Sequence, residues 1–191
     1  MIPVWNSSEV LPPVRPGLPG HSPDRSPYSA LLSEMVQRFA SSPQRIGILR
    51  GLLAYRRALA QQGITTGFQW LDGSFMENKE AFLDEPPADV DVVTFFLLPA
   101  GVENQSAFAA MNADVFDPAR TKAVYQVHAY ALVLGEPMGA LDIRLISYWY
   151  SMWSHRRDGL WKGFLQVDIS PEQDHIAEAL LNQIEQERLN P

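Results

Sequence analysis

Alternating apolar and polar residues predict two strands in the middle of the chain, joined by a turn and a polar segment. The first covers residues 64–71 and leads into Gly73-Ser74, and the second covers residues 89–98. Side chains alternate between the two faces of a strand, so Asp89 and Asp91 point to one side while the neighbouring valines point into the core. The pattern therefore places two carboxylates on one face of a sheet, next to a Gly-Ser turn.

Apolar residues at helical spacing, together with capping signals, predict helices before and after these strands. Ser26-Pro27 and Ser42-Pro43 are typical of helix starts, and Ser170 and Gln173 have the spacing of a capping box. The expected helices cover residues 28–39, 43–62, 106–111, 118–122, 140–155 and 171–189, and two further strands cover residues 127–134 and 160–169. This order predicts an α+β fold with a small mixed β-sheet flanked by helices.

Seven prolines within residues 1–27 predict an extended N-terminal arm. Each proline fixes its own φ and disfavours helical geometry in the residue before it. Trp5, Val10 and Leu11 are expected to anchor this arm to the body of the protein or to a partner subunit. We therefore expect a Pro-rich arm over residues 1–27 and a single domain over residues 28–191.

Charge and composition narrow the classes of protein to consider. The 191 residues include 22 acidic and 15 basic side chains, which gives a net charge of −7, and they include no cysteine. A chain this acidic is not expected to offer an extensive nucleic-acid-binding surface. Without cysteine it has no disulfides and no thiolate metal ligands. We see neither a signal-peptide pattern nor an apolar run of membrane-spanning length, so a cytoplasmic protein with no membrane contact is expected.

The two carboxylates and the Gly73-Ser74 turn together indicate a metal and phosphate site. Mg²⁺ prefers oxygen ligands, takes few of them from the protein, and completes its shell with water and phosphate oxygens. Backbone N–H groups near Gly73 and Ser74 are suited to a phosphate of the same substrate. Such a site suits phosphoryl or nucleotidyl transfer, in which catalysis consists mostly of positioning and charge neutralisation.

The strand, the Gly73-Ser74 turn, the spacer and the run Asp89-Val90-Asp91-Val92 resemble the signature of the nucleotidyltransferase superfamily. That superfamily includes the DNA polymerase beta type and the minimal bacterial nucleotidyltransferases. The resemblance implies a nucleotidyltransferase-like fold and a nucleoside triphosphate as ligand. It also implies that Gly73 and Ser74 bind the triphosphate, and that Asp89 and Asp91 are catalytic residues that hold Mg²⁺ (or Mn²⁺).

A narrower resemblance, to a group of small bacterial proteins assigned to the same superfamily, extends over most of the chain. It rests on Leu11-Pro12-Pro13, on the turn at residues 71–75, and on a tail that contains Arg157 and Lys162. Lys162 and Arg157 are the preferred candidates for binding the triphosphate, because its charge exceeds what two metal ions neutralise. Superfamily members occur in anti-phage and toxin–antitoxin modules, which makes antiviral defence an expected role, with a homodimer or a partner protein of the module as expected assemblies.

The superfamily pattern includes a third carboxylate on a later strand, and the matching position here is His128. Histidine is a poor ligand for Mg²⁺, although it can act as a catalytic base. Asp142 and Glu77 are alternative sources of an oxygen ligand.

Two functions therefore remain open. The first is a Mg²⁺-dependent nucleotidyltransferase that moves a nucleotidyl group from an NTP to a hydroxyl of a small nucleotide, an RNA end or a protein. The second is a catalytically degenerate relative that binds nucleotides or regulates a partner, which His128 supports. The aromatic run at residues 148–150, with Trp153, is expected to contribute to the core and to a dimer surface.

Overall fold

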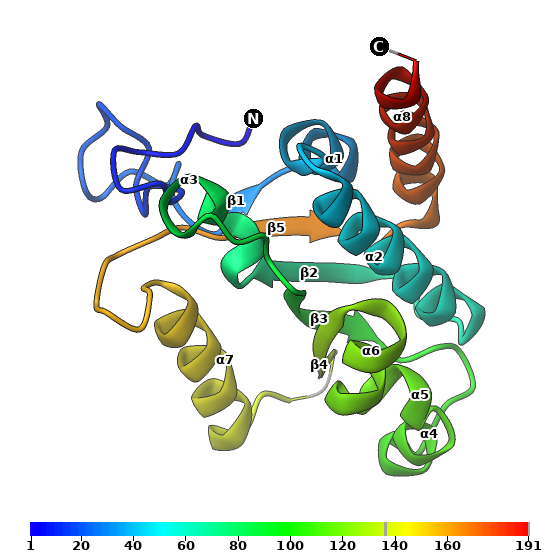
Figure 1. Cartoon of the computed structure of the whole chain (residues 1–191). Coiled ribbons are helices and arrows are strands. Elements are labelled where there is room, and N and C mark those ends of the chain that lie inside the picture. Colours follow the sequence, from blue (N-terminus) through cyan, green and yellow to red (C-terminus); the bar gives the residue numbers. More distant parts are fainter. Residues whose placement is uncertain (136, 191) are drawn as a thin grey trace.

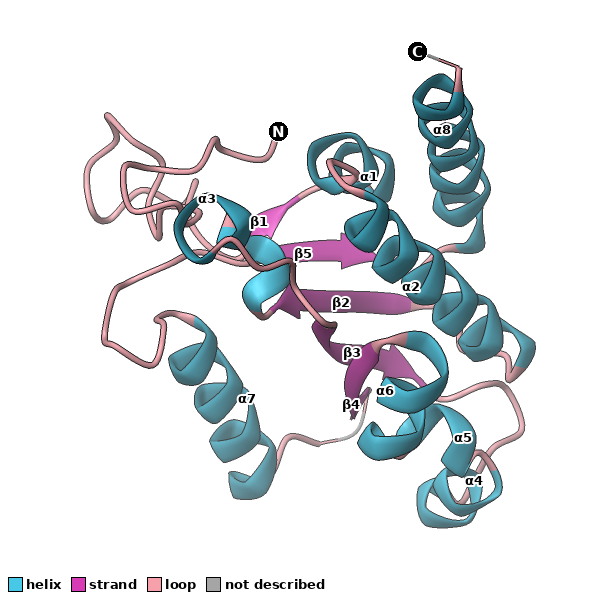
Figure 2. Cartoon of the chain, in the orientation of Figure 1, coloured by secondary structure: helices cyan, strands magenta, loops and turns pink. Residues whose placement is uncertain are grey.

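A computed structural model describes residues 1–135 and 137–190 of the chain. Within these residues the fold is mixed α+β, with one five-stranded mixed sheet and eight α-helices (Figures 1 and 2). The strand order is β1-β5-β2-β3-β4. The outer pairs β1/β5 and β3/β4 are parallel, whereas β2 is antiparallel to both of its neighbours. The strands are β1 (Tyr28–Ser29), β2 (Gly67–Asp72), β3 (Val90–Leu97), β4 (Val127–Leu134) and β5 (Leu165–Asp168).

Helices cover both faces of this sheet. Apolar side chains of α1, α2 and α8 share one core cluster with Leu71 and Val92 of the sheet. The other face is covered by α7 (Figure 2), whose side chains share a second apolar cluster with Trp70 and Val93 of the sheet. The helices are α1 (Leu32–Phe39), α2 (Pro43–Gln61), α3 (Lys79–Leu83), α4 (Gln105–Met111), α5 (Ala113–Phe116), α6 (Pro118–Tyr125), α7 (Ala140–Trp153) and α8 (Pro171–Leu189), with a 3₁₀ turn η1 (Ser74–Met76).

Several predicted elements are confirmed because their local signals are strong. Ser42 caps α2 by accepting a hydrogen bond from the backbone N–H of Arg45, and the helix ends just before Gly63, which adopts a φ of 81°. Asp117 caps α6 in the same way through its carboxylate. Strand β4 occupies the predicted range, residues 127–134. The polar segment after the Gly-Ser turn forms η1 and the short helix α3.

The predicted helix start at Ser26-Pro27 is wrong. Tyr28 and Ser29 form the edge strand β1 and pair with Leu165 and Gln166 of β5, so that α1 begins at Leu32. The hydroxyl of Ser26 does not cap a helix but accepts a hydrogen bond from the backbone N–H of Phe164 at 2.9 Å. A distant strand thus takes the hydrogen bonds that the local signal assigned to a helix.

The predicted capping box at the start of α8 is also not formed. Ser170 makes no side-chain capping bond. Gln173, which was expected to reach back to Ser170, instead accepts a hydrogen bond from the backbone N–H of Leu32 at 3.0 Å. Gln173 therefore joins the first turn of α8 to the start of α1, on the same side of the sheet.

Residues 1–27 form turns and loops that lie against the body of the protein (Figure 1). Val10 and Leu11 are fully buried, and the indole N–H of Trp5 donates to the carbonyl of Met76 at 2.8 Å. The segment also contains one isolated bridge between Val14 and Arg25. The three residues expected to anchor the segment thus do contact the body, and Trp5 reaches the turn that follows β2.

Candidate active site at the end of β2

Three polar side chains form a row across three neighbouring strands of the sheet, β2, β3 and the edge strand β4. Asp72, the last residue of β2, is in register with Asp91 of β3, and Asp91 is in register with His128 of β4. Residues in register on neighbouring strands share a face, and these three lie on the face covered by α7. The alternation that predicted a polar face at Asp89 and Asp91 therefore extends to both neighbouring strands.

The carboxylate of Asp91 lies at the centre of the row. Its Oδ1 is 3.1 Å from Nδ1 of His128. Its Oδ2 faces Gly73, where a Cβ atom would come within 2.5 Å of it. Burial raises the pKa of Asp91, and the nearby charge of Asp89 raises it further, while His128 acts in the opposite direction. The structure thus brings together the Gly-Ser turn, Asp91 and His128, three features that were far apart in the sequence.

Asp89 precedes β3 and forms an ion pair at the surface. Its Oδ2 lies 2.7 Å from Nζ of Lys122 on α6, and this contact raises the pKa of the lysine. The Lys122 side chain is 54% exposed, whereas that of Asp89 is 16% exposed. Because the lysine side chain is long and mostly in water, it can leave Asp89 at low cost when another cation or a phosphate arrives.

The backbone leaves β2 through Gly73, whose φ of 84° suits glycine and few other residues. Phe75 and Met76 follow as fully buried side chains and fix the turn in the core. Arg45 of α2 also stabilises the turn. Its side chain is fully buried and donates to the carbonyls of Phe75 and Glu77 at 2.7 and 2.6 Å. The turn is therefore built into the core and does not behave as a surface loop.

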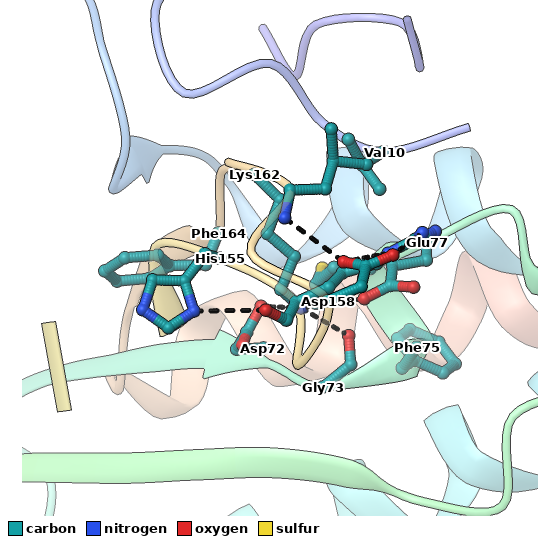
Figure 3. Close-up of polar contacts among 12 residues, drawn as sticks. Val10, Asp72, Gly73, Phe75, Glu77, His155, Asp158, Lys162 and Phe164 are labelled. Carbon is teal, nitrogen blue, oxygen red and sulfur yellow. Dashed lines mark hydrogen bonds and ion pairs between the residues drawn. The ribbon is translucent and has the colours of Figure 1, made fainter. Parts of the chain in front are cut away.

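Lys162 holds the turn from the other side. Figure 3 shows its side chain reaching Asp72, Gly73 and Glu77 from the segment before β5. Its ammonium nitrogen lies 2.9 Å from Asp72 Oδ1 and 3.0 Å from Glu77 Oε1, and it donates to the carbonyl of Gly73 at 3.2 Å. Burial raises the pKa of Asp72 to about 6, although the ammonium of Lys162 opposes this effect. Lys162 is only 4% exposed, so it would not touch a ligand directly. Its effect on a ligand would be indirect, through the position of the turn that it supports.

The other candidates differ in position. Arg157 is exposed in the turn after α7, and no hydrogen bond or ion pair of its side chain is found within the described part of the chain. Asp142 accepts a hydrogen bond from the backbone N–H of Gly139 at the start of α7, so it serves as a helix cap. Glu77 is engaged by Lys162. Neither Asp142 nor Glu77 belongs to the row.

Sequence reasoning missed two residues at this site, Asp72 and Tyr130. The hydroxyl of Tyr130 lies 3.1 Å from Nε2 of His128. Both residues are marked by strand alternation, because Asp72 lies two positions after Trp70 on β2, and Tyr130 lies two positions after His128 on β4. The register between the strands was needed to show that they share a site.

The carboxylate oxygens of Asp89 and Asp91 are of the chemical type that magnesium ions prefer. Asp89 and Asp91 offer carboxylate oxygens, and Mg²⁺ commonly uses one or two carboxylates together with substrate oxygens and water. Among residues 1–135 and 137–190, no group of three or more acidic or histidine side chains is arranged to hold a metal ion. An ion at this site would therefore depend on its ligand for much of its coordination.

Two cavities lie away from the row. One of about 330 Å³ is lined mainly by residues of α2 and α8, among them Leu53, Arg57 and His175. The other, of about 160 Å³, lies beside β4 and includes Phe108 and Val133 in its lining.

No helix in the described residues is long and apolar enough to cross a membrane.

Comparison with protein families matches residues 3–168 to one described as "Family of unknown function (DUF6932)". The match ends at the last residue of β5, so it includes the whole sheet and the row but not α8. No curated protein and no solved structure matches the chain significantly.

Proposed function

Because this chain belongs to the DUF6932 family, whose description names no activity, we propose its function from its own side chains: Mg²⁺-dependent nucleotidyl transfer from an NTP to a hydroxyl acceptor. We also propose that the mixed sheet, with its helices on both faces, is a nucleotidyltransferase-like fold. The observation that carries the proposal is the close approach of Gly73 and Asp91: a Cβ atom at Gly73 would lie 2.5 Å from Asp91 Oδ2, so the candidate phosphate-binding turn adjoins the candidate metal ligand.

Each residue of the site has a role in this proposal. Asp89 and Asp91 hold the metal ion, which supplies charge neutralisation at the phosphates. The backbone N–H groups near Gly73 and Ser74 bind the triphosphate, and Lys122, an exposed cation paired with Asp89, contributes positive charge beside the metal site. Lys162 and Arg45 keep the turn in place from within the core. Arg157 is exposed in the turn after α7, so its side chain is available to the outer phosphates.

The acceptor class follows from the charge of the molecule. With a net charge of −7, the chain repels a long polyanion more than it repels a single nucleotide or a protein. We therefore favour a small nucleotide or a protein hydroxyl as the acceptor over a long RNA. A role in antiviral defence, with a homodimer or a partner protein of such a module, remains a hypothesis that rests on the sequence resemblance alone.

A second function is favoured by a different observation: each carboxylate of the site already has a cationic or hydrogen-bonding partner. Lys122 contacts Asp89, His128 contacts Asp91 and Lys162 contacts Asp72. A site whose charges are balanced internally can hold a nucleotide without a tightly bound metal ion. The alternative is therefore a catalytically degenerate nucleotide-binding or regulatory protein.

Release of pyrophosphate tests the two functions. We would incubate the full chain with a panel of NTPs and dNTPs, with Mg²⁺ or Mn²⁺ and with candidate acceptors, and compare it with the Asp89→Asn plus Asp91→Asn double variant. The double variant is expected to lose activity about a hundredfold or more, because metal-ion charge stabilisation is worth several kcal/mol. Asp114→Asn is the matched control, since Asp114 is an exposed carboxylate that pairs with Arg120 outside the site.

Nucleotide binding, measured separately by equilibrium dialysis, separates the outcomes. Binding without pyrophosphate release under any condition supports the degenerate protein. Activity that survives the double substitution shows that Asp89 and Asp91 are not the metal ligands. If neither binding nor release is found, both functions are wrong.

A further inference from the structure

Asp91, His128 and Tyr130 form a continuous chain of polar contacts. Asp91 Oδ1 lies 3.1 Å from His128 Nδ1, and His128 Nε2 lies 3.1 Å from the hydroxyl of Tyr130. The two rings are tilted with their centroids 5.0 Å apart. His128 and Tyr130 are two positions apart on β4, so strand geometry places both on the face of the row.

The direction of the hydrogen bonds follows from the acceptor at one end. An ionised carboxylate can only accept, so Nδ1 of His128 carries the proton that is donated to Asp91. A ring that carries its proton on Nδ1 presents Nε2 as an acceptor, to which the hydroxyl of Tyr130 can donate. Burial is the main cause that raises the pKa of Tyr130, and the charge of Asp91 adds to it, which keeps this hydroxyl protonated at neutral pH.

This arrangement has the geometry of an activated nucleophile. A nucleophilic side chain contacts a base, and a third group orients the base, with both contacts near hydrogen-bonding distance. Tyrosine is among the side chains that form covalent intermediates or adducts in this way. Tyr130 as a whole residue is partly exposed, so burial does not by itself require its hydroxyl to have a histidine partner.

We propose that the hydroxyl of Tyr130 is itself an acceptor, so that the protein transfers a nucleotidyl group from an NTP onto its own Tyr130. This inference rests on the proposed nucleotidyltransferase function and names one acceptor for that same site. The Tyr130 oxygen attacks the α-phosphorus and forms a phosphodiester bond, while the bond from the α-phosphorus to the bridging oxygen of the β-phosphate breaks. Pyrophosphate leaves with the bonding electrons, and the phenolic proton passes to Nε2 of His128.

The position of β4 makes this product sterically reasonable. β4 is the last strand of the sheet, and Tyr130 lies partly exposed near the start of that strand. An attached nucleotide can therefore extend past the sheet edge into solvent while its phosphate stays near the row. Tyr148 is a nearby tyrosine on α7 that is 58% exposed and has no hydrogen bond to histidine among the described residues. Exposure alone therefore favours Tyr148, whereas the contacts of the site favour Tyr130.

Mass spectrometry of the full chain after incubation with each NTP and Mg²⁺ or Mn²⁺, without an added acceptor, tests the proposal. We expect one added nucleoside monophosphate per chain, on the peptide that contains Tyr130. An NTP labelled at the α-phosphate should transfer its label, and one labelled at the γ-phosphate should not. The adduct should be absent in Tyr130→Phe and retained in Tyr148→Phe, with the folding of each variant checked by its unfolding midpoint.

A second variant keeps the test valid if Tyr130→Phe folds poorly. His128→Gln retains a polar side chain but cannot take the proton, so adduct formation should slow by about a hundredfold or more. Transfer of the nucleotidyl group to an external acceptor, with release of pyrophosphate and no adduct on Tyr130, overturns this inference and leaves the proposed function intact. An adduct on Tyr148 or another residue also overturns it. Nucleotide binding with neither adduct nor pyrophosphate overturns both proposals.

Discussion

Gly73 is required for two reasons, its backbone conformation and the space it leaves for the Asp91 carboxylate. Its φ of 84° lies in the left-handed region, and a side chain there would also meet Asp91 Oδ2 at 2.5 Å. Gly101, in the loop between β3 and α4, has the same φ of 84°, but a Cβ atom there would meet nothing within 4 Å. The two glycines therefore separate backbone strain from damage to the site.

We predict that Gly101→Ala lowers the free energy of unfolding by about 1 kcal/mol, the cost of a left-handed alanine, and leaves nucleotide binding unchanged. Gly73→Ala should lose at least as much stability, and should also weaken nucleotide binding or pyrophosphate release by tenfold or more, because the methyl group displaces the Asp91 carboxylate. Urea unfolding and nucleotide titration measure the two effects. Equal loss of nucleotide binding in both variants would contradict the role given to Gly73.

At this scale the sequence indicated part of the candidate site. Gly73, Ser74, Asp89 and Asp91 are conspicuous because glycine and paired carboxylates interrupt apolar runs. Asp72 and Tyr130 were missed, since an aspartate before a glycine and a tyrosine in a strand are common in many proteins. Only the register between β2, β3 and β4 shows that they share a face with Asp91 and His128.

At the scale of elements, α2 and α8 are joined by two neighbouring arginines that differ in burial. Arg56 is buried and donates to Asp174 at 2.6 Å, to Gln69 at 2.8 Å and to the carbonyl of Asp168 at 2.9 Å. Arg57 is 55% exposed and pairs with Glu178 at 2.8 Å. Arg56 thus connects α8, β2 and the end of β5, whereas Arg57 makes a surface contact.

We predict that Arg56→Met lowers the free energy of unfolding by about 3–5 kcal/mol, because it leaves Asp174 and the buried Gln69 without their partner. Arg57→Met, a matched change one position away, should cost no more than about 1 kcal/mol. Chemical denaturation of both variants measures the difference. Similar losses for the two variants would show that α8 is held mainly by its apolar contacts, with Ala177 and Leu181 as the buried side chains.

Elements with strong local signals were predictable, and those that depend on distant partners were not. Helices α2 and α6 carry serine or aspartate caps followed by proline, and both began where expected. The strand β1 has only two residues, and its partner β5 lies more than 130 residues later in the chain, so no local pattern could indicate it. For the same reason Gln173 could not be assigned to Leu32 in advance.

At the scale of the whole molecule, one sheet separates two apolar clusters. Adjacent residues of the same strand face opposite clusters: Leu71 and Val92 belong to the larger, and Trp70 and Val93 to the smaller. Neither cluster can therefore lose its packing without disturbing the strands that the other requires. Three of the five tryptophans lie in the smaller cluster, which makes fluorescence a selective probe of the α7 side.

We predict a single cooperative unfolding transition, in which tryptophan fluorescence and far-ultraviolet circular dichroism change at the same denaturant concentration. The physical reason is that both clusters share β2 and β3. Fluorescence that changes clearly before the helical signal would mean that α7 and its cluster unfold as a separate unit. Trp153→Ala is a useful comparison, because loss of this buried side chain should lower the free energy of unfolding by about 3–5 kcal/mol. The fluorescence and circular-dichroism transitions should then move together to lower denaturant concentration.

The sequence by itself determined the α+β class, most helix and strand positions, and which residues form a Gly-Ser turn and an Asp-x-Asp strand start, because these depend on periodicity and on residues close together in the chain. The tertiary structure alone decided how the strands are ordered and which polar groups meet. In the tertiary structure Lys162 pairs with Asp72 and Glu77. Asp91 of β3 contacts His128 of β4, which in turn contacts Tyr130. Such contacts depend on strand register, which is set by the packing of the whole sheet.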